Sequence, residues 1–514
     1  MLDNLMMGFG AALTPGNLLW CFVGVLAGTV IGLLPGLGST TGVAVLLPLT
    51  LSFEPLTALI MLAGIYYGAQ YGGTITSVLI STPGEAASVV TAIDGYQMAR
   101  KGRAGAALSI AAIGSFVAAI LSLVLLVAMA PPFAKLALDF GPPENLAVMV
   151  LGLTTIVSFS SGARLRGLAM AMLGILLATV GVDAATGLPR YTFGDVDLLS
   201  GLPFVQVMIG LFAVGEVLFQ IRQGAAEPIR ARFRDLMITR EELSRSKGAI
   251  LRGSVIGYLL GCLPGAGSTL ASFLAYGVEK RVSRNKHEFG HGAIEGVASP
   301  ESANNAAANA NFVPTLALGI PGGATTAVLL GAFMMYGIQP GPLLFDEQPE
   351  LVWGLLASFF IGNVLLLVLN LPLAPLFAQL LRIPYAYMYP LILVTSFVGA
   401  YSIDNNMFSV WVVFAFGLVG YFMKKFDLPM APLVLGLVIG TLFEKALAQT
   451  SAMGDGDLTI VFTRPIALVV LVLAALLLAG PSLVKLAPAN TIGIPVGTMI
   501  GKRRRGRERA PRHG

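Results

Sequence analysis

The chain has 514 residues, of which 56% are hydrophobic and 11% charged, with a mean hydropathy of +0.81. Soluble domains carry about a quarter charged residues, so this composition excludes an ordinary soluble protein. The net charge of +5 is concentrated in the last thirteen residues, which contain seven Lys or Arg and one Glu, and such a tail favours anionic membrane lipid over nucleic acid as a partner.

Apolar runs long enough to cross a bilayer recur along the chain. Nine are uninterrupted, and they lie at 105–130, 146–161, 167–184, 201–221, 351–380, 385–402, 407–423, 428–446 and 465–485. Three further apolar regions contain Pro-Gly pairs, at 17–51, 56–98 and 253–337. We therefore expect an all-α polytopic membrane protein with about 11–12 transmembrane helices.

Basic loops alternate with acidic or neutral loops between these runs. Under the positive-inside rule the basic loops and the C-terminal tail face the cytoplasm. The alternation fails at 253–277, which has a basic segment at both ends. We interpret this region as a re-entrant hairpin, broken at Pro264-Gly265, with Ser268 or Thr269 as the N-cap of the returning half-helix.

The seven-residue sequence at the centre of this predicted hairpin, 263–269, occurs a second time at 34–40, and we call each copy a hairpin string. Residues 34–40 and 263–269 are identical at six of seven positions, and a second Pro-Gly break follows each copy, at Pro83-Gly84 and Pro321-Gly322. The charge map gives the two halves opposite orientations. We thus expect two inverted-topology repeats, each with a re-entrant hairpin and a broken crossing helix, in the divisions 1–221 (first repeat), 222–252 (basic cytoplasmic linker), 253–485 (second repeat) and 486–514 (basic cytoplasmic tail).

Inverted repeats with broken helices are typical of secondary transporters, which bind substrate and ions near mid-membrane. Half-helix N-termini favour carboxylates, although the same residues could serve only as ordinary caps. The candidate substrate-binding residues are Pro35, Gly36, Gly38, Ser39, Thr40, Pro83, Gly84, Pro264, Gly265, Gly267, Ser268, Thr269, Pro321, Gly322, Thr325 and Thr326.

Oxygen-bearing side chains near the breaks are candidates for coupling Na⁺ or H⁺. They are Gln70, Thr74, Glu85, Glu301, Asn304, Asn305 and Asn309. The alternative for the Asn residues is hydrogen bonding between helices. Glu216, near a helix end, is expected to reach water. We expect no enzyme activity and no cofactor, and the alternative within the membrane is an uncoupled channel.

Residues 287–291 read His-Glu-Phe-Gly-His, the pattern of a zinc metalloprotease helix. An intramembrane zinc protease is therefore a further alternative. The surrounding loop is strongly basic, and Gly290 and Gly292 weaken the helix that this zinc site would require.

The motifs, taken together, resemble the large membrane subunit of the tripartite tricarboxylate transporter family, the TctA type. The resemblance rests on 34–38, 67–73, 83–84, 92–100, 263–267, 295–305 and 318–322, which follow in family order. It implies symport of carboxylates across the bacterial cytoplasmic (inner) membrane, driven by a cation gradient. It also implies two partners, a small four-helix membrane subunit and a periplasmic solute-binding protein.

Overall fold

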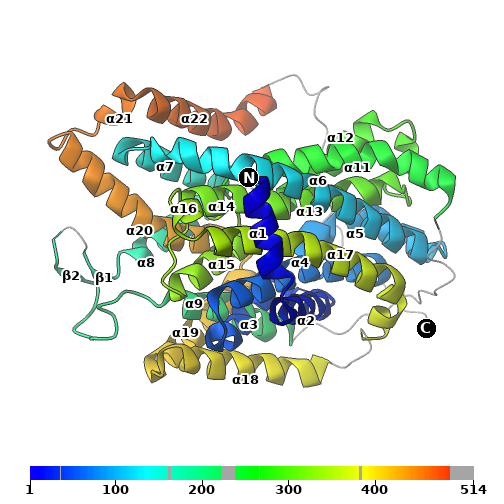
Figure 1. The fold of residues 1–514 in the computed structure, drawn as a ribbon, viewed down its shortest axis with the longest axis horizontal. Coiled ribbons are helices and arrows are strands. Elements are labelled where there is room, and N and C mark those ends of the chain that lie inside the picture. Colours follow the sequence, from blue (N-terminus) through cyan, green and yellow to red (C-terminus); the bar gives the residue numbers. More distant parts are fainter. Residues whose placement is uncertain are drawn as a thin grey trace, which may run out of the picture.

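The computed structural model describes residues 1–34, 36–159, 164–183, 186–221, 238–265, 267–380 and 385–486. Pro35, the first part of the predicted linker (222–237) and the tail from 487 onward lie outside these residues. The described part is almost entirely helical, as Figure 1 shows, with one short hairpin of two strands. The expectation of an all-α membrane protein is confirmed at this level.

The first half of the chain forms α1 to α10. The helices are α1 (Leu2–Ala12), α2 (Pro15–Gly32), α3 (Gly38–Leu46), α4 (Pro55–Ile80), α5 (Thr91–Arg100), α6 (Ala104–Leu138), α7 (Pro142–Phe159), α8 (Arg164–Ala178), α9 (Phe204–Met208) and α10 (Gly215–Gln220). Short 3-10 turns, η1 (Leu47–Ser52) and η2 (Ala86–Val89), follow α3 and precede α5, and a π-helical turn, η3 (Ile209–Val214), joins α9 to α10.

The second half forms α11 to α22. The helices are α11 (Arg240–Gly261), α12 (Gly267–Val282), α13 (Glu295–Ala310), α14 (Phe312–Leu318), α15 (Ala324–Met335), α16 (Leu344–Glu347), α17 (Pro349–Leu380), α18 (Tyr385–Asp404), α19 (Met407–Lys425), α20 (Met430–Met453), α21 (Ile460–Thr463) and α22 (Pro465–Leu486), with a 3-10 turn, η5 (Lys286–Glu288), after α12.

Five described helices are long and apolar enough to cross a membrane. They lie at 15–32, 104–138, 349–373, 407–425 and 430–453, and six shorter apolar helices accompany them. The total of about 11–12 spans remains a prediction.

One expected span is shorter than the apolar run that predicted it. Helix α8 ends at Ala178, and Gly181, with φ +119°, begins the strand β1 (Gly181–Val182). This strand pairs antiparallel with β2 (Pro189–Arg190). A helix cannot continue through a positive φ, so the apolar run to residue 184 overstates the helix.

Two stripes of glycine allow helices to approach closely. On α2, a Cβ at Gly24, Gly28 or Gly32 would overlap a backbone carbonyl of α4. On α11, the glycines at 253, 257 and 261 meet α13 in the same way. Four-residue spacing puts each stripe on one helix face, and the absence of Cβ allows backbone-to-backbone contact.

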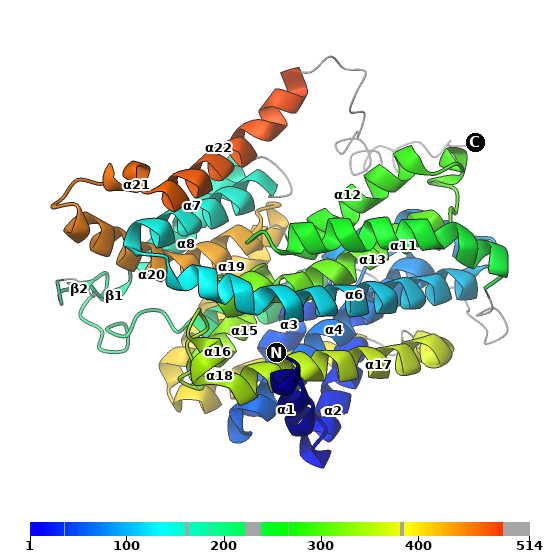
Figure 2. The same ribbon diagram turned by 45° about the horizontal axis from the view of Figure 1, so that its top comes forward.

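The centre of the molecule consists of α4 and α13 with α6 beside them. Every residue of α13 is buried, and so is α4 from Ala58 to Ile80. Figure 2 shows α11, α13 and α6 running side by side, in agreement with their contacts. The polar residues of α4 and α13 therefore lie in the interior.

Candidate functional site

The helices before the two Pro-Gly pairs, α4 and α14, both end where these pairs predict a break. Helix α4 ends at Ile80 and is followed by Ser81 with φ +54°, and α14 ends at Leu318 and is followed by Gly319 with φ +69°. Pro83-Gly84 follows the first break and Pro321-Gly322 the second. These Pro-Gly glycines lie close to backbone, since a Cβ at Gly84 would overlap the Gly32 carbonyl oxygen and one at Gly322 would lie 2.7 Å from the Asn311 Cα.

Both hairpin strings form tight turns between two helices. Gly36 and Gly38 have φ of +81° and +63°, and the matching Gly265 and Gly267 have +79° and +65°. Only glycine adopts these angles without strain.

The Ser/Thr residues behind these turns lie one step further into the helices than expected. Helices α3 and α12 begin at the glycines Gly38 and Gly267, so Ser268 and Thr269 lie in the first turn and are not the N-cap. The same holds for Ser39 and Thr40. The prediction that Ser268 or Thr269 caps the returning helix is therefore wrong, because each helix already begins at the positive-φ glycine before the Ser/Thr pair.

The first hairpin turn contacts both of these helix breaks. The Ser39 amide donates to Glu85 Oε2 at 2.6 Å. The hydroxyls of Ser39 and Thr40 lie 3.0 and 2.8 Å from Thr325 Oγ1, at the start of α15. This turn therefore joins the break after α4 to the break after α14.

The second hairpin turn makes the reciprocal contacts. The Gly265 amide donates to the Gly322 carbonyl at 2.9 Å, and α12 packs against η2, directly behind Glu85. Pro264 lies in the same turn. Thr326 Oγ1 accepts from the Gly323 amide at 2.9 Å and so caps α15. All four breaks thus converge on one region, which is half-buried at Glu85, Gly267 and Gly323.

Two buried residues that the sequence did not single out lie in this region. Asn311 Nδ2 donates to the Tyr66 hydroxyl at 3.3 Å, and both residues are 2% exposed. The side chains of Gln70 and Ser268 also face this hydroxyl. Among the described residues, Gln70 Oε1 and Asn311 Oδ1 have no hydrogen-bond partner. The signal that could have found Asn311 is its position two turns after Asn304.

Glu301 occupies a second polar position, between α13, α4 and α5. Its carboxylate accepts from Thr74 Oγ1 at 2.7 Å and from Thr91 Oγ1 at 2.5 Å, and it is 1% exposed. Asn304 lies one turn further along α13 and faces the same carboxylate. Thr91 was not predicted.

The other two asparagines of α13 face α6. Asn305 Nδ2 donates to Ser115 Oγ at 2.7 Å and Asn309 Nδ2 to Ser122 Oγ at 2.9 Å. These are hydrogen bonds between helices, which was the alternative expectation for this run.

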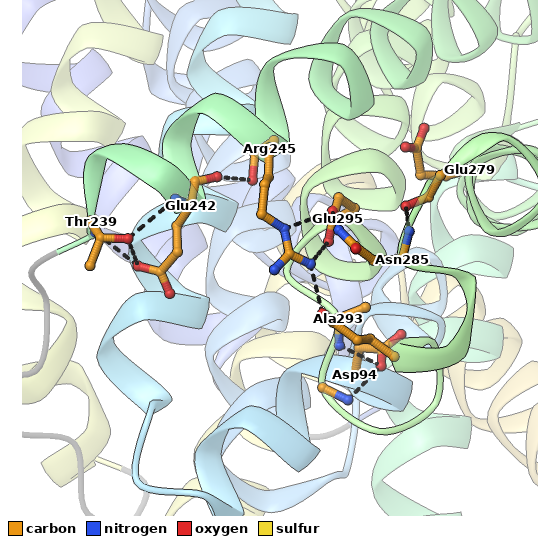
Figure 3. A network of polar contacts seen from close by, with 12 residues as sticks. Asp94, Thr239, Glu242, Arg245, Glu279, Asn285, Ala293 and Glu295 are labelled. Atoms are coloured by element: carbon orange, nitrogen blue, oxygen red, sulfur yellow. Dashed lines mark hydrogen bonds and ion pairs between the residues drawn. The ribbon is translucent and has the colours of Figure 1, made fainter.

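A polar network connects α5, α11 and the loop before α13, as Figure 3 shows. Asp94 Oδ1 accepts from the amides of Gly290 and Gly292 at 2.8 Å and of Ala293 at 3.0 Å, while Tyr276 donates to Oδ2 at 2.9 Å. Asp94 thereby joins α5 of the first half to the loop before α13.

Arg245 of α11 continues the network. It donates to Glu288 at 2.6 Å and to Glu295 through two bonds of 3.0 Å. Burial raises the pKa of the Glu295 carboxyl, but hydrogen bonds from Arg245, its own backbone and Asn285 outweigh burial and hold that pKa below its usual value.

The zinc-protease pattern does not form a helix. Residues 286–288 make a single 3-10 turn, Gly290 has φ +87°, and Glu288 is paired with Arg245. The two histidines are therefore not one helical turn apart on a common face. Among the described residues, no three His, Cys, Asp or Glu are grouped to hold a metal.

Glu216 does not reach water as expected. It is 4% exposed and forms an ion pair with Lys424 of α19. Its Oε1 also accepts from Gln220 at 2.7 Å, and both side chains lie against Gly36 at the first hairpin turn. The packing of α10 on α19 buries the end of this helix.

A family model described as "Tripartite tricarboxylate transporter TctA family" matches residues 18–435. The chain belongs to this family. Membership supports a tricarboxylate transporter large subunit in a multi-pass membrane protein, and it places this TctA member in a transporter family, not an enzyme family.

Two relatives come from Agrobacterium vitis. This TctA member is 48% identical to an "Uncharacterized 52.8 kDa protein in TAR-I ttuC' 3'region" over 488 residues, which cover 95% of this chain and 96% of the relative. It is 50% identical to an "Uncharacterized protein in TAR-II ttuC' 3'region" over 211 residues, or 41% of this chain and 87% of that protein. No solved structure matches.

Proposed function

We propose that this protein is the large permease subunit of a tripartite secondary transporter in the bacterial cytoplasmic membrane. It takes up tricarboxylates or related carboxylates that a periplasmic solute-binding protein delivers, together with a small four-helix membrane subunit. The observation that carries the proposal is the convergence of four helix breaks in one half-buried region, where Ser39 contacts both Glu85 and Thr325.

The proposed architecture is a pair of inverted-topology repeats. In support, the glycine stripes of α2 and α11 occupy matching places before the two hairpin turns, and each packs on the crossing helix of its own half. Re-entrant hairpins at 34–40 and 263–269 would then approach mid-membrane from opposite sides. Rocking of one repeat against the other would open the site to each side of the membrane in turn, which is alternating access.

Substrate carboxylates are proposed to bind at half-helix N-termini. The first turns of α3, α12 and α15 bring backbone amides and the Ser/Thr hydroxyls of 39–40, 268–269 and 325–326 toward the convergence of the breaks. Partial positive charge at such ends favours anions without a buried cationic side chain.

The coupling cation, Na⁺ or H⁺, is proposed to bind at the buried oxygens beside this region. Glu301 carries a carboxylate whose neighbours are the neutral hydroxyls of Thr74 and Thr91. A carboxylate in such surroundings favours either a proton or a metal cation. Glu85 and Gln70 bring further oxygens to the centre.

Reconstitution tests this function. Proteoliposomes that contain all three components should accumulate a carboxylate when a Na⁺ or H⁺ gradient is imposed and should lose accumulation when the gradient is collapsed. Flux that continues at the same rate without the gradient would indicate an uncoupled channel and refute coupling. Vesicles that lack the solute-binding protein are the control for delivery.

A further inference from the structure

The two hairpin turns differ in what lies at the start of the returning helix. Gly38 and Gly267 hold the same place in the repeated string and have nearly equal φ. A Cβ at Gly38 would lie 3.1 Å from Glu85 Oε2, the oxygen that accepts the Ser39 amide. A Cβ at Gly267 would have no atom of the described residues within 4 Å. A carboxylate of the chain itself thus fills the N-terminus of α3, while the matching place at α12 is open.

The sequence explains this asymmetry through one pair of residues. The residue directly after Pro-Gly is Glu85 in the first break and Gly323 in the second. Gly323 has an extended backbone, with φ −167°, which any residue adopts. A Cβ there would come no closer than 3.5 Å to other atoms. Backbone strain therefore does not require a glycine at 323, and its effect is to leave room beside α12.

The buried side-chain amide of Asn311 lies beside the same open space. The point that a Gly323 Cβ would take lies 3.5 Å from Asn311 Nδ2 and 3.9 Å from the Gly267 Cα. Asn311 is 2% exposed, and its Oδ1 has no hydrogen-bond partner among the described residues. Its amide nitrogen has two hydrogens, of which one serves the Tyr66 hydroxyl. Because the described residues supply no acceptor for the second hydrogen, the Asn311 nitrogen can donate to a carboxylate oxygen at this point, whereas Oδ1, an acceptor, would bind a donor such as water.

We propose that one carboxylate group of the transported substrate binds at the N-terminus of α12, against Gly323 and Asn311. It takes the place that the Glu85 carboxylate fills at α3. This inference rests on the proposed transport function and narrows it. Of the half-helix N-termini proposed above, that of α3 does not hold a substrate carboxylate, because the Glu85 carboxylate already occupies it. The first-turn amides of α12 and the hydroxyls of Ser268 and Thr269 supply the donors.

The test introduces at position 323 the glutamate that the first break has at position 85. Gly323→Glu and Gly323→Gln, which differ in charge but hardly in volume, are compared in the complete three-component transporter in proteoliposomes. The probes are a panel of radiolabelled di- and tricarboxylates, including citrate and succinate. We expect the KM of Gly323→Glu to be at least tenfold higher than that of Gly323→Gln. Citrate should raise the unfolding temperature of the Gln variant and leave that of the Glu variant unchanged.

A second pair of variants serves if Gly323→Glu fails to fold. Ser268→Ala should raise KM at least threefold more than Ser39→Ala, its match in the first hairpin turn. Equal KM values for the Glu and Gln variants, or equal effects of the two serine variants, would overturn the inference and leave transport itself intact. Wild-type protein that takes up no member of the panel would instead refute the proposed function, and this inference with it.

Discussion

Glu301 of α13 accepts a 2.7 Å hydrogen bond from Thr74 of α4, a residue 227 positions earlier in the chain. With Thr91 of α5 as its second donor, this buried carboxylate joins α4 and α5 of the first half to α13 of the second through neutral groups. Burial of an ionised carboxylate is unfavourable without a proton or a cation. In the proposed coupling site, this pair would link the packing of the two halves to the binding of a positive charge.

Replacement of Glu301 by Gln should uncouple uptake from the cation gradient. The amide keeps the shape, and it can accept from one threonine and donate to the other, but it removes the charge. We therefore expect gradient-driven initial rates to fall at least tenfold. Uptake into proteoliposomes with and without an imposed gradient measures this. Glu54→Gln is the matched control, because Glu54 is exposed at the start of α4. Full gradient dependence in the Glu301→Gln variant would contradict the role.

Gly257→Ala should destabilise the protein. Its Cβ would overlap the carbonyl oxygen of Ala303, and the two helices would have to separate. Overpacking of this kind costs about 1–3 kcal/mol. Gly10→Ala is the control, because a Cβ there meets no atom of the described chain within 4 Å. Thermal unfolding in detergent should show a lower midpoint for Gly257→Ala alone, and equal midpoints would show that the stripe tolerates a methyl group.

Asp94→Asn should loosen the loop before α13. Three loop amides donate to one carboxylate oxygen, and a neutral amide oxygen accepts such bonds more weakly. We expect a loss of about 1–3 kcal/mol in stability and faster hydrogen exchange at 289–293. Tyr276→Phe, which removes only the bond to Oδ2, should leave exchange in that segment slower than Asp94→Asn does. Unchanged exchange in Asp94→Asn would mean that other contacts hold the loop.

The Arg245–Glu295 pair should make stability depend on acid. Because the pKa of Glu295 is held below its usual value, its stabilising effect is complete above the unfolded-state pKa of about 4.3 and is lost as the pH falls through the lower folded-state pKa. The unfolding temperature of wild type should therefore drop more between pH 5 and pH 3 than that of Glu295→Gln. Parallel curves for the two proteins would exclude this contribution.

The sequence determined the class of the protein and the places where its helices break. Apolar run length indicates helices for a bilayer, because only a helix satisfies its own backbone there. Proline and glycine mark breaks by local sterics, which is why Pro83-Gly84 and Pro321-Gly322 could be located from their letters alone.

Tertiary structure decided which residues meet. Glu85 and Ser39 are 46 positions apart, and Asn311 and Tyr66 are 245 apart, so local pattern carries no information about either contact. It also separated the asparagines of α13 into two sets, because the packing of α6 fixes which face of that helix is interhelical. Only the fold distinguished glycines that admit a neighbouring helix from Gly323, which leaves room beside α12. That difference depends on what lies across the space from each Cα, which is a property of the assembled helices.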